Sequence, residues 1–178
     1  MGIIKIWPKD VHIFYIPTIW PNIVYSVFEH DLDVDKTDAV CQLVHEKLEQ
    51  YLVPSKIIIY GRTIEQTKEL SQALGCHKYY CEVSDQTKKE NIIGHWQHGD
   101  GQLIVATNTF GLGINAPNVQ VIVHIGAIYQ MWSYSQESGR GGQDGQQSEA
   151  IMVMPARKQE AFQKKQAQAQ ARTQPWNI

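Results

Sequence analysis

The sequence predicts an α/β domain with a mainly parallel sheet of about six strands and helices on both faces. Short, continuous apolar runs recur along the chain, and such runs are typical of strands that are buried on both faces of a parallel sheet. Segments with apolar residues at helical spacing alternate with these runs, which indicates βαβ units with right-handed crossovers.

The first predicted strand covers residues 23–28, which are β-branched and aromatic and follow a proline. Residues 36–52 place apolar side chains three and four positions apart, which indicates a helix. Asp35 or Thr37 can cap this helix, and Pro54 ends it.

A continuous apolar run predicts the second strand over residues 56–60. The helix after it begins with a capping box between Thr63 and Gln66. Gly75 stands where a left-handed residue ends a helix.

The second half of the chain is predicted to form four strands and a helix over residues 85–97, where Ile92, Ile93 and Trp96 have helical spacing. The strands are expected at residues 78–81, 103–106, 119–124 and 150–154.

Composition divides the 178 residues into three parts. Residues 1–21 are interrupted by prolines and are expected to form an arm or linker. Residues 22–155 form the predicted domain, and residues 156–178 form a basic tail rich in Gln and Ala.

The net charge of −2 gives no strong global field toward nucleic acid or membrane, so polyanion contacts must come from local patches. The three cysteines are an odd number, which predicts reduced thiols inside a cell. Cys76, His77 and Cys81 lack the fourth ligand and the pair spacing of a structural zinc site, so no metal site is predicted.

A glycine-rich run over residues 136–145 surrounds Arg140. Glycines allow close approach to the backbone, and a guanidinium is a planar, permanently charged donor that suits phosphate. The alternative is a flexible loop with one solvated arginine.

Residues 107–117 contain Gly111, Gly113 and Ala116, which formally fit the dinucleotide fingerprint G-x-G-x-x-G/A. That fingerprint must open a helix, and Pro117 with the strand after it leaves no room for one. We therefore expect a loop at the carboxyl edge of the sheet whose polar groups suit a backbone phosphate or a ribose. A polar turn that satisfies its own backbone is the alternative.

These two loops resemble motifs V and VI of superfamily 2 helicases, specifically the RecQ family of DNA helicases. Residues 106–119 are similar to motif V nearly residue for residue, and residues 136–140 with Asp144-Gly145 are similar to motif VI. The resemblance extends over residues 21–154.

The resemblance implies a RecA-like helicase C-terminal domain, the second lobe of a motor that binds ATP with Mg²⁺ between two lobes. Its implied partners are single-stranded or duplex DNA and a first RecA-like lobe in cis or trans, with no membrane, and its implied location is the nucleus. It gives Arg140 the contact to the γ-phosphate. The implied nucleotide-coupling residues are Gln136, Gly139, Gly113 and Asn115, and the implied DNA-binding residues are Arg62, Thr107, Asn108 and Thr109.

Three departures from the family pattern stand out. The sequence contains no G-x-x-x-x-G-K-[ST] and no D-E-x-H, so it is not expected to assemble a complete ATP site by itself. Gln143 stands where the family has the finger arginine, and a neutral amide cannot replace that charge. Tyr60-Gly61-Arg62-Thr63 replaces a turn of the Cys-Asn-Ser type.

Two hypotheses follow. The chain is the C-terminal motor lobe of a RecQ-like ATP-dependent 3′-to-5′ DNA helicase, inactive alone, or it is a degenerate, non-catalytic module that binds DNA or protein. An unrelated nucleotide-binding domain with a doubly wound sheet is a third, weaker idea.

Overall fold

The computed structural model describes residues 20–31, 34–80, 86–99, 101–107, 110, 116–128 and 130–156. The predicted arm up to residue 19, the predicted tail from residue 157 and Cys81 lie outside the described residues, so these expectations stay predictions.

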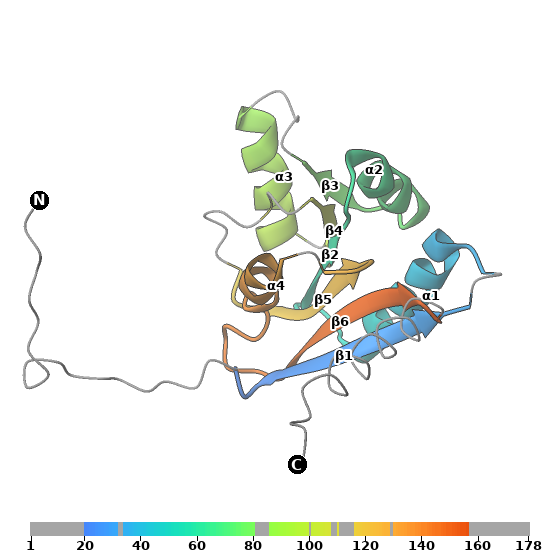
Figure 1. Ribbon diagram of the computed structural model, residues 1–178. Helices are drawn as coiled ribbons and strands as arrows, with labels where there is room; N and C mark the ends of the chain where they lie inside the picture. The colour runs from blue at the N-terminus through green and yellow to red at the C-terminus, as the bar shows by residue number, and fades with distance from the viewer. Residues whose placement is uncertain are drawn as a thin grey trace, which may run out of the picture.

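The described chain forms six strands and four helices (Figure 1). The strands are β1 (Ile23–His30), β2 (Lys56–Tyr60), β3 (His77–Tyr79), β4 (Leu103–Ala106), β5 (Val119–Ile125) and β6 (Ser148–Pro155). The helices are α1 (Lys36–Gln50), α2 (Ile64–Ala73), α3 (Gln86–His98) and α4 (Met131–Ser138). The predicted elements are thus confirmed, with ends that differ by at most two residues, whereas no bounds were predicted for α4.

All six strands belong to one parallel sheet with the order β1-β6-β5-β2-β4-β3. The predicted fold class is therefore confirmed. Figure 1 shows α3 and α4 on one side of this sheet and α1 and α2 on the other. Parallel neighbours need crossover connections, and the helices supply them.

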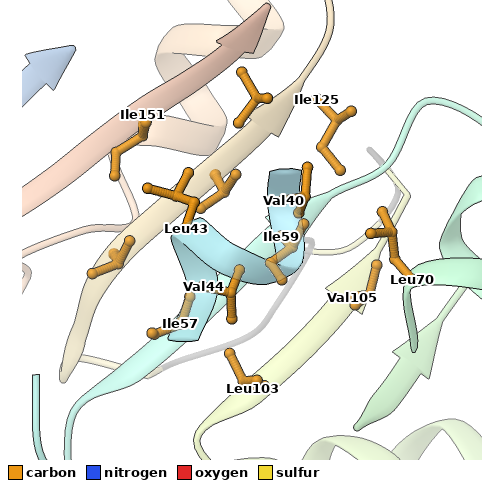
Figure 2. Packing of buried hydrophobic residues seen from close by; sticks show 13 residues of the cluster. Val40, Leu43, Val44, Ile57, Ile59, Leu70, Leu103, Val105, Ile125 and Ile151 are labelled. Atoms are coloured by element: carbon orange, nitrogen blue, oxygen red, sulfur yellow. The ribbon is translucent and has the colours of Figure 1, made fainter. Parts of the chain in front are cut away.

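The face under α1 and α2, here called the aliphatic face, carries a core of valine, leucine and isoleucine side chains (Figure 2). Val40, Leu43 and Val44 of α1 pack on alternate residues of the strands, such as Ile57 and Ile59 of β2. Because side chains alternate along a strand, the residues between them lie on the opposite face.

The opposite face, here called the aromatic face, is covered by α3 and α4. Ile58 and Tyr60 of β2 lie there with Trp96 of α3 and Phe110. Trp96 and Phe110 make an edge-to-face contact with ring centroids 5.7 Å apart. The continuous apolar strands of the sequence follow from this burial on both sides.

Polar side chains fix several ends of the elements. Asp35 caps α1 by accepting from the Thr37 N–H at 2.7 Å, as one of the two predicted caps. Thr63 Oγ1 caps α2 by accepting from the Gln66 N–H at 3.1 Å. In the predicted capping box, the Gln66 side chain would accept from the Thr63 N–H. In the structure, Gln66 Oε1 accepts instead from the Arg62 N–H at 2.9 Å, which fixes the turn at the end of β2.

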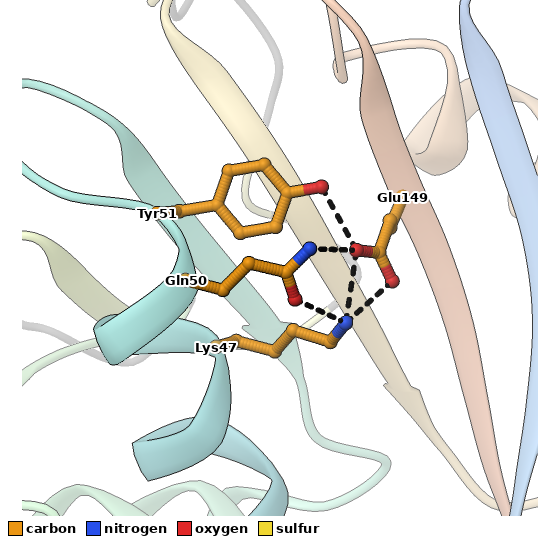
Figure 3. A network of polar contacts seen from close by, with 4 residues as sticks. All are labelled: Lys47, Gln50, Tyr51 and Glu149. Carbon is orange, nitrogen blue, oxygen red and sulfur yellow. Dashed lines mark hydrogen bonds and ion pairs between the residues drawn. The ribbon is translucent and has the colours of Figure 1, made fainter.

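A polar network joins α1 to β6 (Figure 3). Lys47 Nζ lies 2.9 and 2.8 Å from the two carboxylate oxygens of Glu149, and the Tyr51 hydroxyl donates to Glu149 Oε1 at 2.8 Å. Burial, followed by the hydrogen bond to Glu149, raises the pKa of Tyr51 to about 12. The network therefore depends on a neutral Tyr51.

Candidate nucleotide and nucleic-acid site

The predicted glycine run begins inside a helix. Gln136 to Ser138 form the last turn of α4, and Gly139 ends that helix with its N–H donating to the Ser135 carbonyl at 2.9 Å. Gln136 is exposed on α4. The true loop, here called the motif VI loop, covers residues 139–147 between α4 and β6.

Backbone contacts seat the motif VI loop against the start of β5. The Gly142 N–H donates to the Val119 carbonyl at 2.8 Å, and the Asp144 N–H donates to the Pro117 carbonyl at 3.1 Å. Gln120 Nε2 also donates to the Asp144 carboxylate at 2.9 Å. The motif VI loop is therefore an ordered part of the sheet edge and not a free glycine linker.

Asn22 holds the motif VI loop from the other side. Its Nδ2 donates to the carbonyls of Gly142 and Gln146 at 2.7 and 2.8 Å. Gly142 has φ +62°, and a Cβ there would lie 2.3 Å from Asn22 Nδ2. The sequence interpretation missed the roles of Asn22 and Gln120, although both lie within residues 21–154, over which the chain resembles the family.

Arg140 and Gln143 lie close to described residues of the predicted motif V. Both side chains line a small space of about 10 Å³ together with Phe110 and Ala116. Gln143 is exposed, and its Nε2 donates to the Gly139 carbonyl at 3.2 Å. Asn108, Thr109, Gly113 and Asn115 lie outside the described residues.

Thr107 begins the turn after β4. It is buried, its N–H donates to the Tyr79 carbonyl at 3.1 Å, and its carbonyl accepts from the Phe110 N–H at 2.9 Å. The Gly61 N–H donates to the Ala106 carbonyl at 2.8 Å, so the Gly61-Arg62 turn and the predicted motif V leave the sheet side by side.

An open cleft of about 350 Å³ lies at the carboxyl ends of β2 and β5. Arg62 lines it and is exposed. Gly126 has φ +88°, and a Cβ there would come within 3.0 Å of the Arg62 side chain. The glycine therefore gives this guanidinium room at the edge where parallel sheets bind ligands.

A buried cluster forms the floor of this cleft. His124 of β5 stacks on Tyr60 with ring centroids 5.2 Å apart and contacts Tyr134 of α4 at 4.7 Å. His124 Nε2 lies 3.0 Å from Glu137 Oε2, although the angles do not satisfy a hydrogen bond. The sequence interpretation missed this pair, since a histidine in an apolar strand gives no signal of a carboxylate on a later helix.

None of the described helices has the length and apolar character needed to cross a membrane. A sequence profile of the Helicase conserved C-terminal domain matches residues 35–145. The ATP-dependent DNA helicase Q-like 2 of Arabidopsis thaliana is 31% identical over 141 residues, which cover 74% of this chain and 19% of that protein.

Solved helicase structures share the fold. Mss116p DEAD-box helicase domain 2 bound to an RNA duplex matches with a TM-score of 0.65 at 16% identity, covering 76% of this chain and 55% of that chain. The helicase Lhr of Mycobacterium smegmatis, bound to ssDNA and AMP-PNP, matches with a TM-score of 0.61 at 17% identity, covering 75% of this chain and 19% of that one.

The parallel sheet and the matched profile together define a helicase C-terminal domain. The chain belongs to the Helicase conserved C-terminal domain family, and relatives at 30–31% identity are RecQ-family DNA helicases. The predicted resemblance is confirmed, and the idea of an unrelated nucleotide-binding domain is wrong. The chain spans about a fifth of the length of these relatives.

Proposed function

We propose that this chain is the C-terminal motor lobe of a RecQ-like ATP-dependent 3′-to-5′ DNA helicase. The observation that carries the proposal is that the two predicted motifs lie side by side, since Arg140 and Gln143 of the motif VI loop line one small space with Phe110 and Ala116 of the predicted motif V. A movement of the motif VI loop on nucleotide binding would thereby be transmitted to the predicted DNA-binding residues of motif V.

In the proposed motor, Arg140 contacts the γ-phosphate of ATP, whose Mg²⁺ and P-loop belong to a first lobe in cis or trans. The nucleotide-coupling residues are Gln136, Gly139, Gly113 and Asn115, and the DNA-binding residues are Arg62, Thr107, Asn108 and Thr109. By analogy with RecQ relatives, the motor would serve DNA repair and recombination in the nucleus.

The 178 residues contain no P-loop, so we propose that the chain alone hydrolyses no ATP. The test measures ATP turnover and strand separation by the chain alone and after addition of a RecQ first lobe. Turnover is expected only in the mixture. Hydrolysis by the chain alone would contradict the assignment of roles to the two lobes.

Gln143 is proposed to limit the turnover of that mixture. A finger arginine contributes about three to five orders of magnitude in related motors, so Gln143→Arg should raise turnover at least about tenfold. Gln147→Arg is the matched control, because it adds the same charge to another exposed glutamine of the motif VI loop. Equal turnover in both variants would refute the finger assignment.

A second candidate function is a non-catalytic module that binds single-stranded DNA. It is favoured by the neutral Gln143 side chain, which is bonded to the Gly139 carbonyl. The isolated chain should then bind oligothymidylate with an affinity that falls steeply with salt, because phosphate contacts release counterions. Arg62→Gln should lower the salt slope by about one, whereas Lys68→Gln on the exposed side of α2 should not.

A further inference from the structure

A second open cleft, of about 280 Å³, lies where the carboxyl ends of β1, β5 and β6 meet the amino ends of α1 and α2. It is here called the β1 cleft. It shares Arg62 and Gly126 with the cleft of about 350 Å³, so Arg62 lies between the two spaces.

The polar lining of the β1 cleft consists of hydrogen-bond donors. The polar side chains that line it are those of His30, Lys36, Arg62, Thr63 and Gln66. Lys36 and Arg62 are positively charged and exposed, and none of the described lining residues is acidic. In a chain with a net charge of −2, the β1 cleft is therefore a local positive patch.

The acceptor oxygens of Thr63 and Gln66 are already used within the protein. Thr63 Oγ1 accepts from the Gln66 N–H at 3.1 Å, and Gln66 Oε1 accepts from the Arg62 N–H at 2.9 Å. These bonds leave the hydroxyl proton of Thr63 and the amide protons of Gln66 as donors. A ligand of the β1 cleft must therefore accept hydrogen bonds, as an oxyanion does.

His30 supplies a second, independent indication of a ligand. Its side chain lines the β1 cleft and the residue is only 9% exposed. Its Nδ1 lies 3.0 Å from the Asp31 carbonyl, and since a carbonyl only accepts, Nδ1 carries a proton. Its Nε2 is buried and has no hydrogen-bond partner in the described part of the chain. Buried polar atoms nearly always have a partner, and an oxyanion would be one for a protonated Nε2.

The elements around His30 bring positive charge to it. Lys36 comes from the first turn of α1 and Arg62 from the turn before α2, while the lining residues of β5 and β6 are apolar. The positive ends of the two helix dipoles point the same way.

The carboxylates of this region are turned to other tasks. Asp35 caps α1 by accepting from the Thr37 N–H at 2.7 Å, and Glu69 of α2 accepts from the Thr37 hydroxyl at 2.8 Å. Asp31 follows His30 and is exposed. None of the three lines the β1 cleft.

We propose that the β1 cleft binds a phosphate-type oxyanion, which Lys36, Arg62 and a protonated His30 hold together. Arg62 is also one of the proposed DNA-binding residues, so the use of this site by a DNA backbone rests on the proposed function. The site itself does not, and a free anion tests it.

The experiment titrates the 178-residue chain with sulfate at constant ionic strength and follows the imidazole resonances of His30 by NMR. Sulfate is the probe because, unlike phosphate, it does not titrate between pH 6 and pH 8. Sulfate should shift the His30 resonances, and its affinity should be at least about fivefold higher at pH 6 than at pH 8, since an imidazole gains its charge over this range.

Two variants test the other contacts. Lys36→Gln should weaken sulfate binding about fivefold at both pH values, because one charge is lost. Lys68→Gln is the matched control, since Lys68 is an exposed lysine of α2 outside the β1 cleft. His30→Asn keeps an amide donor in place of Nδ1 and should remove the pH dependence, as followed on the Arg62 Nε–Hε resonance.

Sulfate that leaves the His30 resonances unmoved, or binds equally at pH 6 and pH 8, would overturn the proposal. Equal losses in Lys36→Gln and Lys68→Gln would do the same. Should His30→Asn not fold, the wild-type pH comparison and the two lysine variants still decide.

Oligothymidylate distinguishes a DNA phosphate from a free anion. If a DNA backbone occupies the site, oligothymidylate should displace sulfate, and Lys36→Gln should lower the salt slope of its binding by about one. If oligothymidylate binds without displacing sulfate, the ligand of the site is a free oxyanion. Absence of any oligothymidylate binding would contradict the proposed DNA contacts, while the sulfate titration would still decide the site.

Discussion

The two faces of the sheet differ in the side chains that they bury, although the same strands form both faces. The aliphatic face packs α1 and α2 on valine, leucine and isoleucine side chains. The aromatic face mixes Trp96, Phe110 and Tyr60 with the polar groups of His124, Glu137 and Arg140. Both faces bury apolar side chains, but among the residues named here only the second face combines them with charged and titratable groups.

The alternation of single strands produces this difference. In β2, Ile57 and Ile59 point to the aliphatic face, while Ile58 and Tyr60 point to the aromatic one. A substitution at one residue of such a strand should therefore alter the packing of one face and leave the other face unchanged.

The largest expected effect is on the aliphatic face. Ile59→Ala should lower the free energy of unfolding by about 2–5 kcal/mol, because it leaves a cavity in a fully buried cluster. Urea denaturation measures this. The Nε–Hε NMR resonance of the Arg140 guanidinium, which lies beside Phe110, should be unchanged in the folded fraction. A shift of that resonance would show that the two faces are not separable.

The second effect concerns the anchoring of the motif VI loop. Asn22→Ala removes two hydrogen bonds to the carbonyls of Gly142 and Gln146, and it should cost about 1–3 kcal/mol in the free energy of unfolding. Gln147→Ala is the control, since that side chain is exposed in the same loop. Equal stabilities of the two variants in urea would show that Asn22 does not hold the loop.

A third test uses pH to probe the edge of the aliphatic face. Because the pKa of Tyr51 is raised to about 12 in the folded state, its contribution to stability is complete below about pH 10, the pKa of an unfolded tyrosine. The contribution is lost as pH rises from about 10 to 12, where the unfolded chain ionises first. The difference in unfolding free energy between wild type and Tyr51→Phe should shrink over this range, and a constant difference would contradict the raised pKa of Tyr51.

The smallest expected effect is at the exposed end of α4. Trp132 is 75% exposed, so Trp132→Ala should change the free energy of unfolding by less than about 0.5 kcal/mol. A larger loss in thermal denaturation would show that the aromatic face extends to this residue.

The sequence was sufficient to predict the strands, because continuous apolar runs such as Lys56–Tyr60 and Leu103–Ala106 indicate strands that are buried on both faces. It also indicated Arg140 and Gln143 through their motif. It could not predict that His124 approaches Glu137, because that contact joins a strand to a later helix and depends on how the chain between them folds. The anchoring by Asn22 was hidden for the same reason, since its side chain bonds to residues 120 and 124 positions later.

The strand order also has a consequence for biosynthesis. β1 is the first of the described strands to be synthesised, yet its partner in the sheet is β6, the last of them. Until Ser148–Pro155 has emerged, β1 has no neighbour in the sheet and β5 presents an open edge that could pair with another chain. A nascent chain stalled before β6 should therefore need shielding by chaperones, whereas eight further residues close the sheet.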